Sequence, residues 1–206
     1  MKNYLINHWI KTIKKYKNIS SEKEEVLRYG LEGFYLTVTK TFVIMVIAAI
    51  FNCFWESIIF TILFGLLRSF SHGLHAKKSW LCWFVSIVTF VFIPLLAKNY
   101  IIHQNVKVLI GLIGTILIFI NSPADTYKRP IVNRKRRLKL KYISGTISLI
   151  YFIICLLINN QFISNCLIYS ILLQNILISP LTYKLFKLPY NNYISYLNKH
   201  PELNNL

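Results

Sequence analysis

Long apolar runs follow one another along most of this 206-residue chain, and no other feature constrains its fold as strongly. An α-helix needs about 20 mainly apolar residues, within a range of roughly 17–25, to cross the hydrocarbon core of a bilayer. The last four runs are long enough, whereas the first two are short and contain Lys40 and Glu56. A single long span near residues 41–67 is the alternative for this first pair. The runs cover residues 34–52, 54–67, 80–97, 106–122, 142–158 and 162–181.

The charges between the runs decide between five spans and six. The chain has 24 Lys and Arg residues against 7 Asp and Glu residues, concentrated in segments 1–33, 68–79, 123–141 and 182–206. With six spans all four segments lie on one side of the membrane, which the positive-inside rule makes the cytoplasmic side. Fusing the first two runs would place the basic N-terminal segment outside. We therefore predict an all-α integral membrane protein with six transmembrane helices, the first pair short, tilted or partly re-entrant, and both termini in the cytoplasm.

The N-terminal segment is basic and amphipathic. Apolar side chains recur at helical spacing through residues 1–19, and lysines fill most of the other face. This pattern predicts a helix lying on an anionic membrane surface, with an ordinary solvated helix as the alternative. Ser21-x-x-Glu24 is typical of a capping box and predicts a second helix leading into the membrane. The whole chain, 1–206, is expected to form one polytopic domain: interfacial segment 1–33, bundle 34–181 and cytoplasmic tail 182–206.

Composition excludes several classes of protein. Hydrophobic residues make up 55% of the chain, which excludes disorder. Segment 123–141 is basic enough for a nucleic-acid contact, but it lies between two predicted spans. A topological determinant, an anionic-lipid contact or a site for an acidic peptide is therefore favoured, and no nucleic-acid partner is predicted. The four cysteines have no regular spacing, so no disulfide framework is predicted.

The segment between the second and third runs could carry chemistry. It holds His72, His75 and Cys82 within eleven positions, although the chain has only five histidines. These side chains could form a three-ligand zinc site, or Cys82 could be a nucleophile with an imidazole base. The third interpretation is that these residues carry no chemistry and are simply a histidine in a loop and a cysteine in the core.

Helix geometry sharpens the nucleophile hypothesis. In one straight helix His75 and Cys82 would lie about 10 Å apart along the axis, too far for a hydrogen bond. Ser79 is a good N-cap, so a new helix starting there would place Cys82 in its first turn, where the dipole and free amides favour a thiolate. Gly73 would let the preceding loop fold so that His75 reaches the thiol. Three neighbouring cations would also favour the thiolate: Arg68, Lys77 and Lys78.

The run Arg68…Gly73-x-His75-Ala76-x5-Cys82 resembles the accessory gene regulator B (AgrB) family, membrane cysteine endopeptidases of Gram-positive quorum sensing. The likeness spans most of the chain and rests on the order and spacing of its motifs in a membrane context. It continues at Pro123-Ala124-Asp125-Thr126, Lys128, Pro130, the basic run 134–141 and Glu24-x-x-x-Arg28-Tyr29-Gly30. The resemblance implies that His75 is the general base and Cys82 the nucleophile, without a metal or cofactor. Residues expected to support them are Arg68, Gly73, Ser79 and Asp125. Asp125 either orients a group in the site or shapes the loop.

The resemblance also implies the substrate, an AgrD-type precursor with an amphipathic leader, a central segment with Cys or Ser, and an acidic tail. Cys82 would release the tail through a thioester, and the peptide would close into a thiolactone or lactone. The site would lie near the cytoplasmic face of the bacterial cell membrane, in a homodimer that also contacts anionic lipids. The basic residues expected to attract the tail are Lys77, Lys78, Lys128, Arg129, Arg134, Lys135, Arg136 and Arg137.

Two rival functions remain at this stage. Six spans also suit a small peptide exporter without protease activity, and Lys40 and Glu56 would then be ionisable residues at membrane depth. These two side chains either snorkel or pair with each other across the first hairpin. The other rival is a zinc-dependent membrane hydrolase that uses His72, His75 and Cys82.

Overall fold

A computed structural model describes residues 2–16, 20–74, 79–127 and 130–200. It confirms an all-α protein with six helical segments that are long and apolar enough to cross a membrane. The third helical segment is continuous, but it changes from α-helical to π-helical geometry and back. The six are α2 (Ser21–Ile50), α3 (Phe54–Ser71), α4–η1–α5 (Ser79–Ile87, Val88–Phe92, Ile93–Asn99), α6 (Gln104–Asn121), α7 (Arg134–Leu157) and α8 (Gln161–Ile178).

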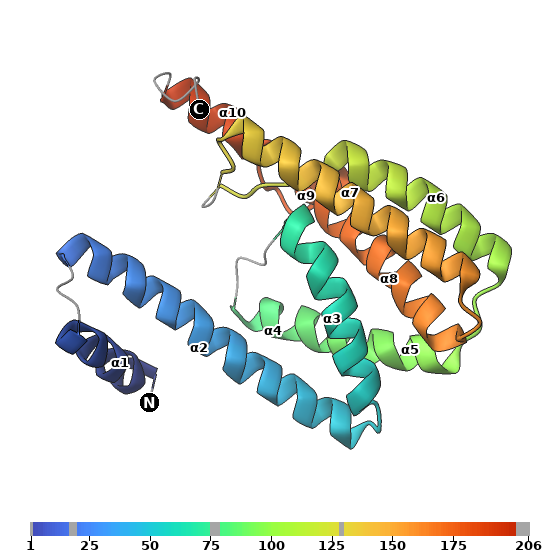
Figure 1. The fold of residues 1–206 in the computed structure, drawn as a ribbon, viewed down its shortest axis with the longest axis horizontal. Coiled ribbons are helices and arrows are strands. Elements are labelled where there is room, and N and C mark those ends of the chain that lie inside the picture. Colours follow the sequence, from blue (N-terminus) through green and yellow to red (C-terminus); the bar gives the residue numbers. More distant parts are fainter. Residues whose placement is uncertain (1, 17–19, 75–78, 128–129, 201–206) are drawn as a thin grey trace.

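The spans alternate in direction, so their connections separate into two ends of the bundle (Figure 1). Short turns at 51–53, 100–103 and 158–160 join the helices at one end. The chain leaves α3, α6 and α8 at the other end, which we call the loop end. Because the basic segments of the sequence connect to the loop end, the observed helix order agrees with the six-span prediction.

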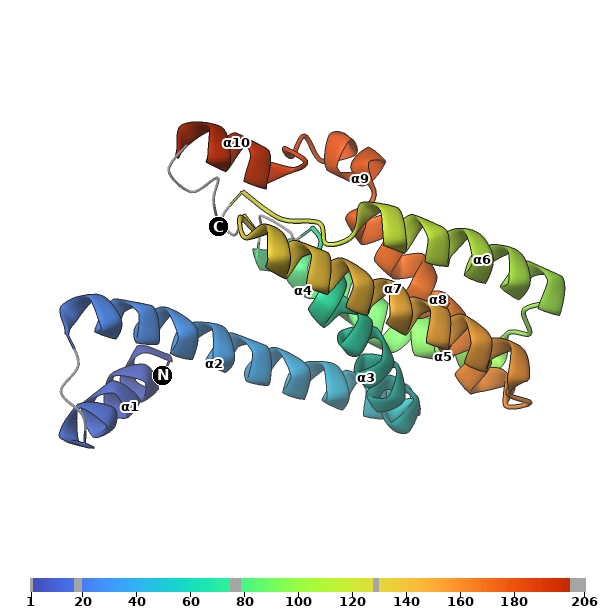
Figure 2. The same cartoon turned by 45° about the horizontal axis from the view of Figure 1, so that its top comes forward.

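Four helices, α3, α6, α7 and α8, form the main core. Leu67, Ile118, Tyr151 and Ile168 are buried there, one from each helix. α8 is the most enclosed, since half of its apolar window is buried, against 11% for α2. α2 crosses beside this core and contacts α3, α4 and η1, which leaves most of its apolar surface exposed (Figure 2).

Glycines let the helices of the core approach closely. A Cβ atom on Gly145 of α7 would lie 2.2 Å from the Phe119 ring of α6, and one on Gly111 would lie 2.1 Å from the Phe152 ring. Small residues at such positions are the usual means of close helix contact in membranes, where lipid gives little hydrophobic drive to association.

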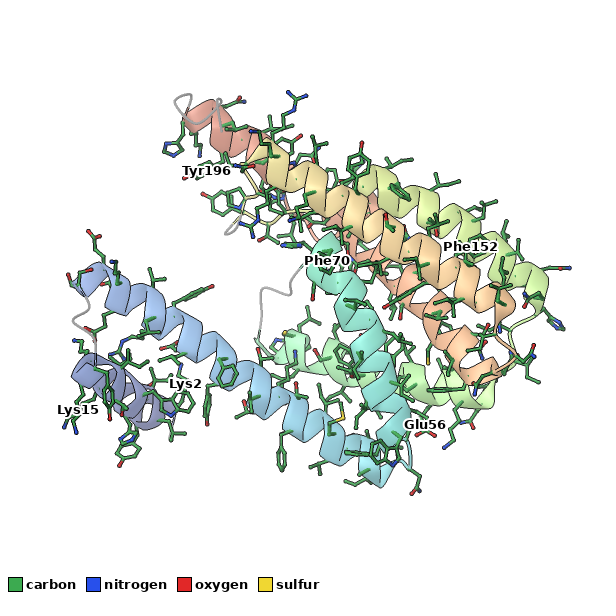
Figure 3. All side chains as sticks on the ribbon, in the orientation of Figure 1. Lys2, Lys15, Glu56, Phe70, Phe152 and Tyr196 are labelled. Carbon is green, nitrogen blue, oxygen red and sulfur yellow. The ribbon has the colours of Figure 1, made fainter. Side chains whose placement is uncertain are left out.

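The N-terminal helix α1 (Lys2–Tyr16) packs along the start of α2. Its Ile6 and Ile10 are buried, and Trp9 lies edge-on to Phe34 of α2. Lys2 (labelled in Figure 3) and Lys14 form ion pairs with Glu32 and Glu24, respectively. The predicted amphipathic helix is therefore present, and part of its apolar face contacts α2.

The predicted capping box is wrong, although the predicted helix is present. α2 begins at Ser21, so Ser20 is the N-cap, and its side chain makes no capping hydrogen bond. Glu24 pairs instead with Lys14 and Arg28. The carboxylate is engaged by α1 because α1 lies against this turn.

A single methyl group at Gly145 should disturb the α6–α7 contact. We expect Gly145→Ala to lower the free energy of unfolding by about 1–3 kcal/mol, because the Phe119 ring must move. Gly65→Ala is the matched control: no atom lies within 4 Å of its added Cβ. It should be neutral or slightly stabilising, because alanine favours a helix over glycine. Unfolding in detergent micelles measures both, and equal stability of the two variants would contradict this packing.

Candidate active site

Cys82 lies in the first turn of α4, at the loop end. Ser79 is the predicted N-cap, but the helix includes it and so begins one residue earlier than predicted, which makes Cys82 its fourth residue. The Cys82 side chain is half-buried, whereas Cys53, Cys155 and Cys166 are buried, and all four are free thiols. Cys82 is therefore the most exposed of the four cysteine residues.

His75, Lys77 and Lys78 lie outside the described residues, and so do Lys128 and Arg129. The predicted approach of His75 to Cys82 therefore stays a prediction. Among the residues that the structure does describe, no three His, Cys, Asp or Glu side chains gather as metal ligands. The zinc hypothesis also includes His75, so it too stays untested.

Lys40 of α2 contacts Cys82 directly, which the sequence interpretation missed. Its ammonium Nζ lies 3.1 Å from the Cys82 Sγ and 3.1 Å from the Cys82 carbonyl oxygen. α2 has 30 residues, a length of about 45 Å, and so exceeds a hydrocarbon core of about 30 Å. Lys40 stands ten residues before the C-terminal end of α2, about 15 Å along the axis, and the first turn of α4 meets it there.

Glu56 has a different partner, at the opposite end of the bundle. Its Oε1 lies 2.6 Å from the Nζ of Lys98, which also donates to the Asn52 carbonyl. The alternative in which Lys40 and Glu56 pair across the first hairpin is therefore wrong. Each of these ionisable side chains has found a local partner.

Arg68 holds the backbone that leads to His75. From the last turn of α3, its guanidinium donates to the carbonyls of His72, at 2.5 Å, and Leu74, at 2.6 Å. Gln174 of α8 donates to the same His72 carbonyl at 2.8 Å. Arg68 is thus placed as a structural clamp on residues 72–74.

Gly73 passes through a gap that only glycine fits. Its φ is +116°, and a Cβ atom would lie 2.5 Å from Arg68 Nη1 and 2.8 Å from the Leu177 carbonyl. Its amide donates to the Ala124 carbonyl, and the next amide, of Leu74, donates to Leu177. The segment is therefore fixed between α3, α8 and the chain after α6. The half-buried His72 precedes it, and burial lowers the pKa of its imidazole.

Asp125 is nearly fully buried and caps the C-terminal helix α10 (Asn192–Lys199). Its two carboxylate oxygens accept from the amides of Asn192, at 2.9 Å, and Tyr193, at 2.8 Å. Arg137 of α7 lies 3.6 Å from the same carboxylate and stacks on the Tyr193 ring. The Asp125 carbonyl accepts from Tyr183 of α9 (Pro180–Leu185). These contacts favour the loop-shaping interpretation of Asp125.

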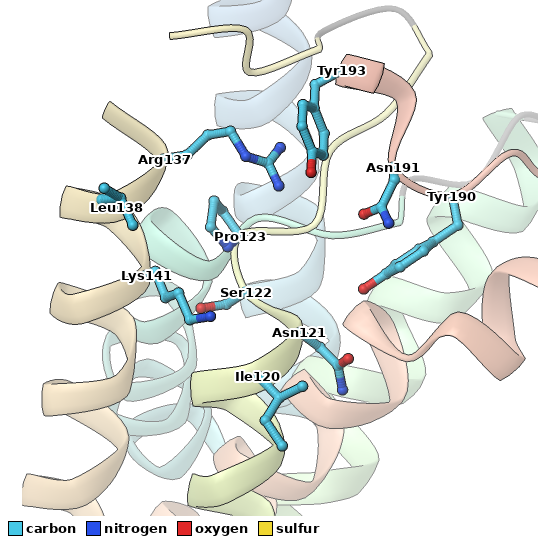
Figure 4. Close-up of a pocket in the computed structure, with 10 residues that line it drawn as sticks. All are labelled: Ile120, Asn121, Ser122, Pro123, Arg137, Leu138, Lys141, Tyr190, Asn191 and Tyr193. Atoms are coloured by element: carbon cyan, nitrogen blue, oxygen red, sulfur yellow. The ribbon is translucent and has the colours of Figure 1, made fainter. Parts of the chain in front are cut away.

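The basic start of α7 divides into exposed and engaged side chains. Arg134, Lys135 and Arg136 are exposed, whereas Arg137 is engaged by Asp125 and Tyr193. Beside them is a cavity of about 380 Å³. Arg137 and Lys141 line it from α7, opposite Tyr190, Asn191 and Tyr193 (Figure 4).

Comparisons with known proteins agree over most of the chain. The family model for accessory gene regulator B matches residues 6–178. A putative AgrB-like protein of Clostridium acetobutylicum is 32% identical over 188 residues, 90% of each chain. One from Listeria monocytogenes is 35% identical over 82% of this chain and 83% of its own. An accessory gene regulator protein B of Staphylococcus aureus is 30% identical over 86% of this chain and 94% of its own. No solved structure matches the chain.

Removing the Asp125 charge should loosen α10. We expect Asp125→Asn to weaken the capping of Asn192 and Tyr193 and the pairing with Arg137, at a cost of about 1–3 kcal/mol, because charge-assisted hydrogen bonds are lost. Hydrogen exchange followed by mass spectrometry should show faster exchange in residues 192–199. Glu25→Gln, which removes an exposed carboxylate, should leave this exchange unchanged. Unchanged protection of α10 in Asp125→Asn would contradict the capping role.

Proposed function

Because the chain belongs to the accessory gene regulator B family, we propose that it is a membrane cysteine endopeptidase that processes an AgrD-type precursor peptide. In this proposal the chain is one polytopic domain of the bacterial cell membrane, with its loop end in the cytoplasm. The observation that carries the proposal is the position of Cys82, a half-buried thiol in the first turn of α4 at that end.

The first chemical step is attack on the carbonyl at the C-terminal end of the signal segment. His75 takes the proton of the Cys82 thiol, and the sulfur adds to the carbonyl carbon. The C–N bond then breaks, and His75 gives its proton to the amine of the departing tail. The first amides of α4 are suited to bind the developing oxyanion, because they lack helical partners.

The thioester is then displaced from within the peptide. A thiol or hydroxyl of the signal segment attacks the thioester carbon, His75 accepts its proton, and Cys82 leaves as a thiolate. A thiolactone or lactone ring results. Arg68 and Gly73 support both steps indirectly, since they fix residues 72–74 immediately before the proposed base.

The acidic tail of such a precursor would meet a positive surface. Arg134, Lys135 and Arg136 are exposed at the start of α7, and the nearby cavity is lined by Arg137 and Lys141. Such a surface attracts acidic peptides and anionic lipids over a distance set by the ionic strength. Pairing of this chain with a second copy remains part of the proposal.

Removal of either proposed catalytic side chain should abolish processing. We expect Cys82→Ala and His75→Ala to slow tail release from a cognate precursor by at least about a thousandfold, because nucleophile and base act as a unit. Cys166→Ala, which removes a buried thiol of α8, is the control and should keep activity. Release is followed by mass spectrometry with purified protein in liposomes. Normal release by Cys82→Ala would refute the mechanism, whereas peptide transport without any tail release by the unmodified protein would favour an exporter.

Inhibitors separate the cysteine mechanism from the zinc hydrolase. We expect iodoacetamide to abolish tail release, because alkylation blocks the sulfur, and we expect EDTA and 1,10-phenanthroline to leave it unchanged. Mass spectrometry should show one carbamidomethyl group on Cys82 in the inactivated protein. Loss of activity with the chelators, and its return with zinc, would instead favour a site made of His72, His75 and Cys82.

A further inference from the structure

We propose that Lys40 is the positioning residue for the Cys82 sulfur: its ammonium holds the thiolate in the resting protein and again when the sulfur leaves the thioester. The inference rests on the proposed function in one respect, the role of Cys82 as nucleophile. It assigns a task to a lysine that the sequence alone leaves unexplained within an apolar run.

The contact geometry fixes both partners. The Lys40 Nζ donates to the Sγ and to the carbonyl oxygen of the same residue, each at 3.1 Å. The carbonyl belongs to the helix backbone, so it anchors the ammonium beside the sulfur rather than leaving it free to rotate away. The two residues are 42 positions apart and lie on α2 and α4, so the contact also ties the first span to the third.

The charges around the pair leave the sulfur as the natural counter-ion. No carboxylate pairs with Lys40 among the residues that the structure describes. On α2 the acidic residues Glu24 and Glu32 are engaged by α1 and by Arg28, and η1 has no ionisable side chain. On α3, Arg68 is held by backbone carbonyls and Glu56 by Lys98. His75, Lys77 and Lys78 lie outside the described part of the chain.

An ammonium in apolar surroundings is costly unless an anion or several hydrogen bonds compensate it. A thiolate at 3.1 Å supplies that anion, and the ammonium favours the thiolate in return, because the attraction is strong where water is scarce. The positive end of the α4 dipole acts in the same direction. Lys40 and the first turn of α4 therefore stabilise one charge from two sides.

This arrangement serves both halves of the proposed reaction. Before attack, the proposed base His75 has taken the thiol proton, and the ammonium of Lys40 pairs with the sulfur. During ring closure the bond from sulfur to the acyl carbon breaks with its electron pair on sulfur, while His75 takes the proton of the peptide's thiol or hydroxyl. The ammonium of Lys40 then pairs with the departing thiolate and keeps its own proton throughout.

The test is the pH dependence of Cys82 alkylation by iodoacetamide, measured at that residue by peptide mass spectrometry. In Lys40→Met the pH of half-maximal rate should rise by about one unit or more, and the rate at pH 7 should fall roughly tenfold, since alkylation requires the thiolate. Lys40→Arg should restore most of the wild-type profile. Lys98→Met, which removes a lysine at the opposite end of the bundle, is the control and should leave the profile unchanged.

The plateau of the Cys82 alkylation rate at high pH distinguishes an electrostatic role of Lys40 from a purely structural one. If Lys40 only tied α2 to α4, the plateau would change and the half-maximal pH would not, and that result would overturn the proposal. If Lys40→Met does not fold, the wild-type profile still decides: a half-maximal pH no lower than that of a free cysteine peptide overturns it. A shifted profile in Lys40→Met together with normal tail release by Cys82→Ala would refute the peptidase proposal and leave the Lys40–Cys82 pair standing.

Discussion

Polar groups inside a helical membrane bundle must find their partners within the protein, because hydrocarbon offers no hydrogen bonds. This requirement accounts for the ionisable residues that interrupt the apolar runs. Lys40 binds Cys82, Glu56 binds Lys98, and the buried Lys107 of α6 donates to Ser164 of α8 at 2.8 Å. Each pair joins two different helices. Each of these charged side chains thus cross-links two helices, and one of the three contacts involves the proposed nucleophile, Cys82.

The loop end depends on the same requirement, because irregular backbone is buried there. Two arginines satisfy it in different ways. Arg68 occupies the carbonyls of His72 and Leu74, and Arg137 pairs with Asp125, whose carboxylate caps α10. Between the two clamps, the Gly73 amide bonds to the Ala124 carbonyl and so connects the segment after α3 with the segment after α6. The chain before His75 is therefore fixed by contacts from three sides.

Most of the fold could be predicted from the sequence, because run length and loop charge are local properties. They fixed the number of spans, and the serine before an apolar run indicated where α4 starts. Contacts between distant residues could not be predicted. The Lys40–Cys82 pair depends on how α2 packs against α4, 42 positions further along the chain, and the Asp125 cap depends on a helix 67 residues further along the chain. The capping box failed for the same reason, since α1 takes Glu24 as an ion-pair partner.

The net charge of +17 therefore has several separate uses. Arg68 is engaged by backbone carbonyls and Arg137 by the Asp125 carboxylate, and both side chains hold the loop end together. Lys40 faces the Cys82 sulfur, and Arg134, Lys135 and Arg136 face outward. On the proposed function, the last two groups act on different parts of one substrate: the exposed cations attract the acidic tail, and Lys40 stabilises the sulfur that cuts it off. After cleavage the tail is held only by the exposed cations, where water and salt weaken the attraction, whereas the acyl group stays covalently bound beside Lys40. On this proposal the tail leaves because the cations that hold it are exposed to water, and the acyl group stays because its thioester bond lies beside Lys40.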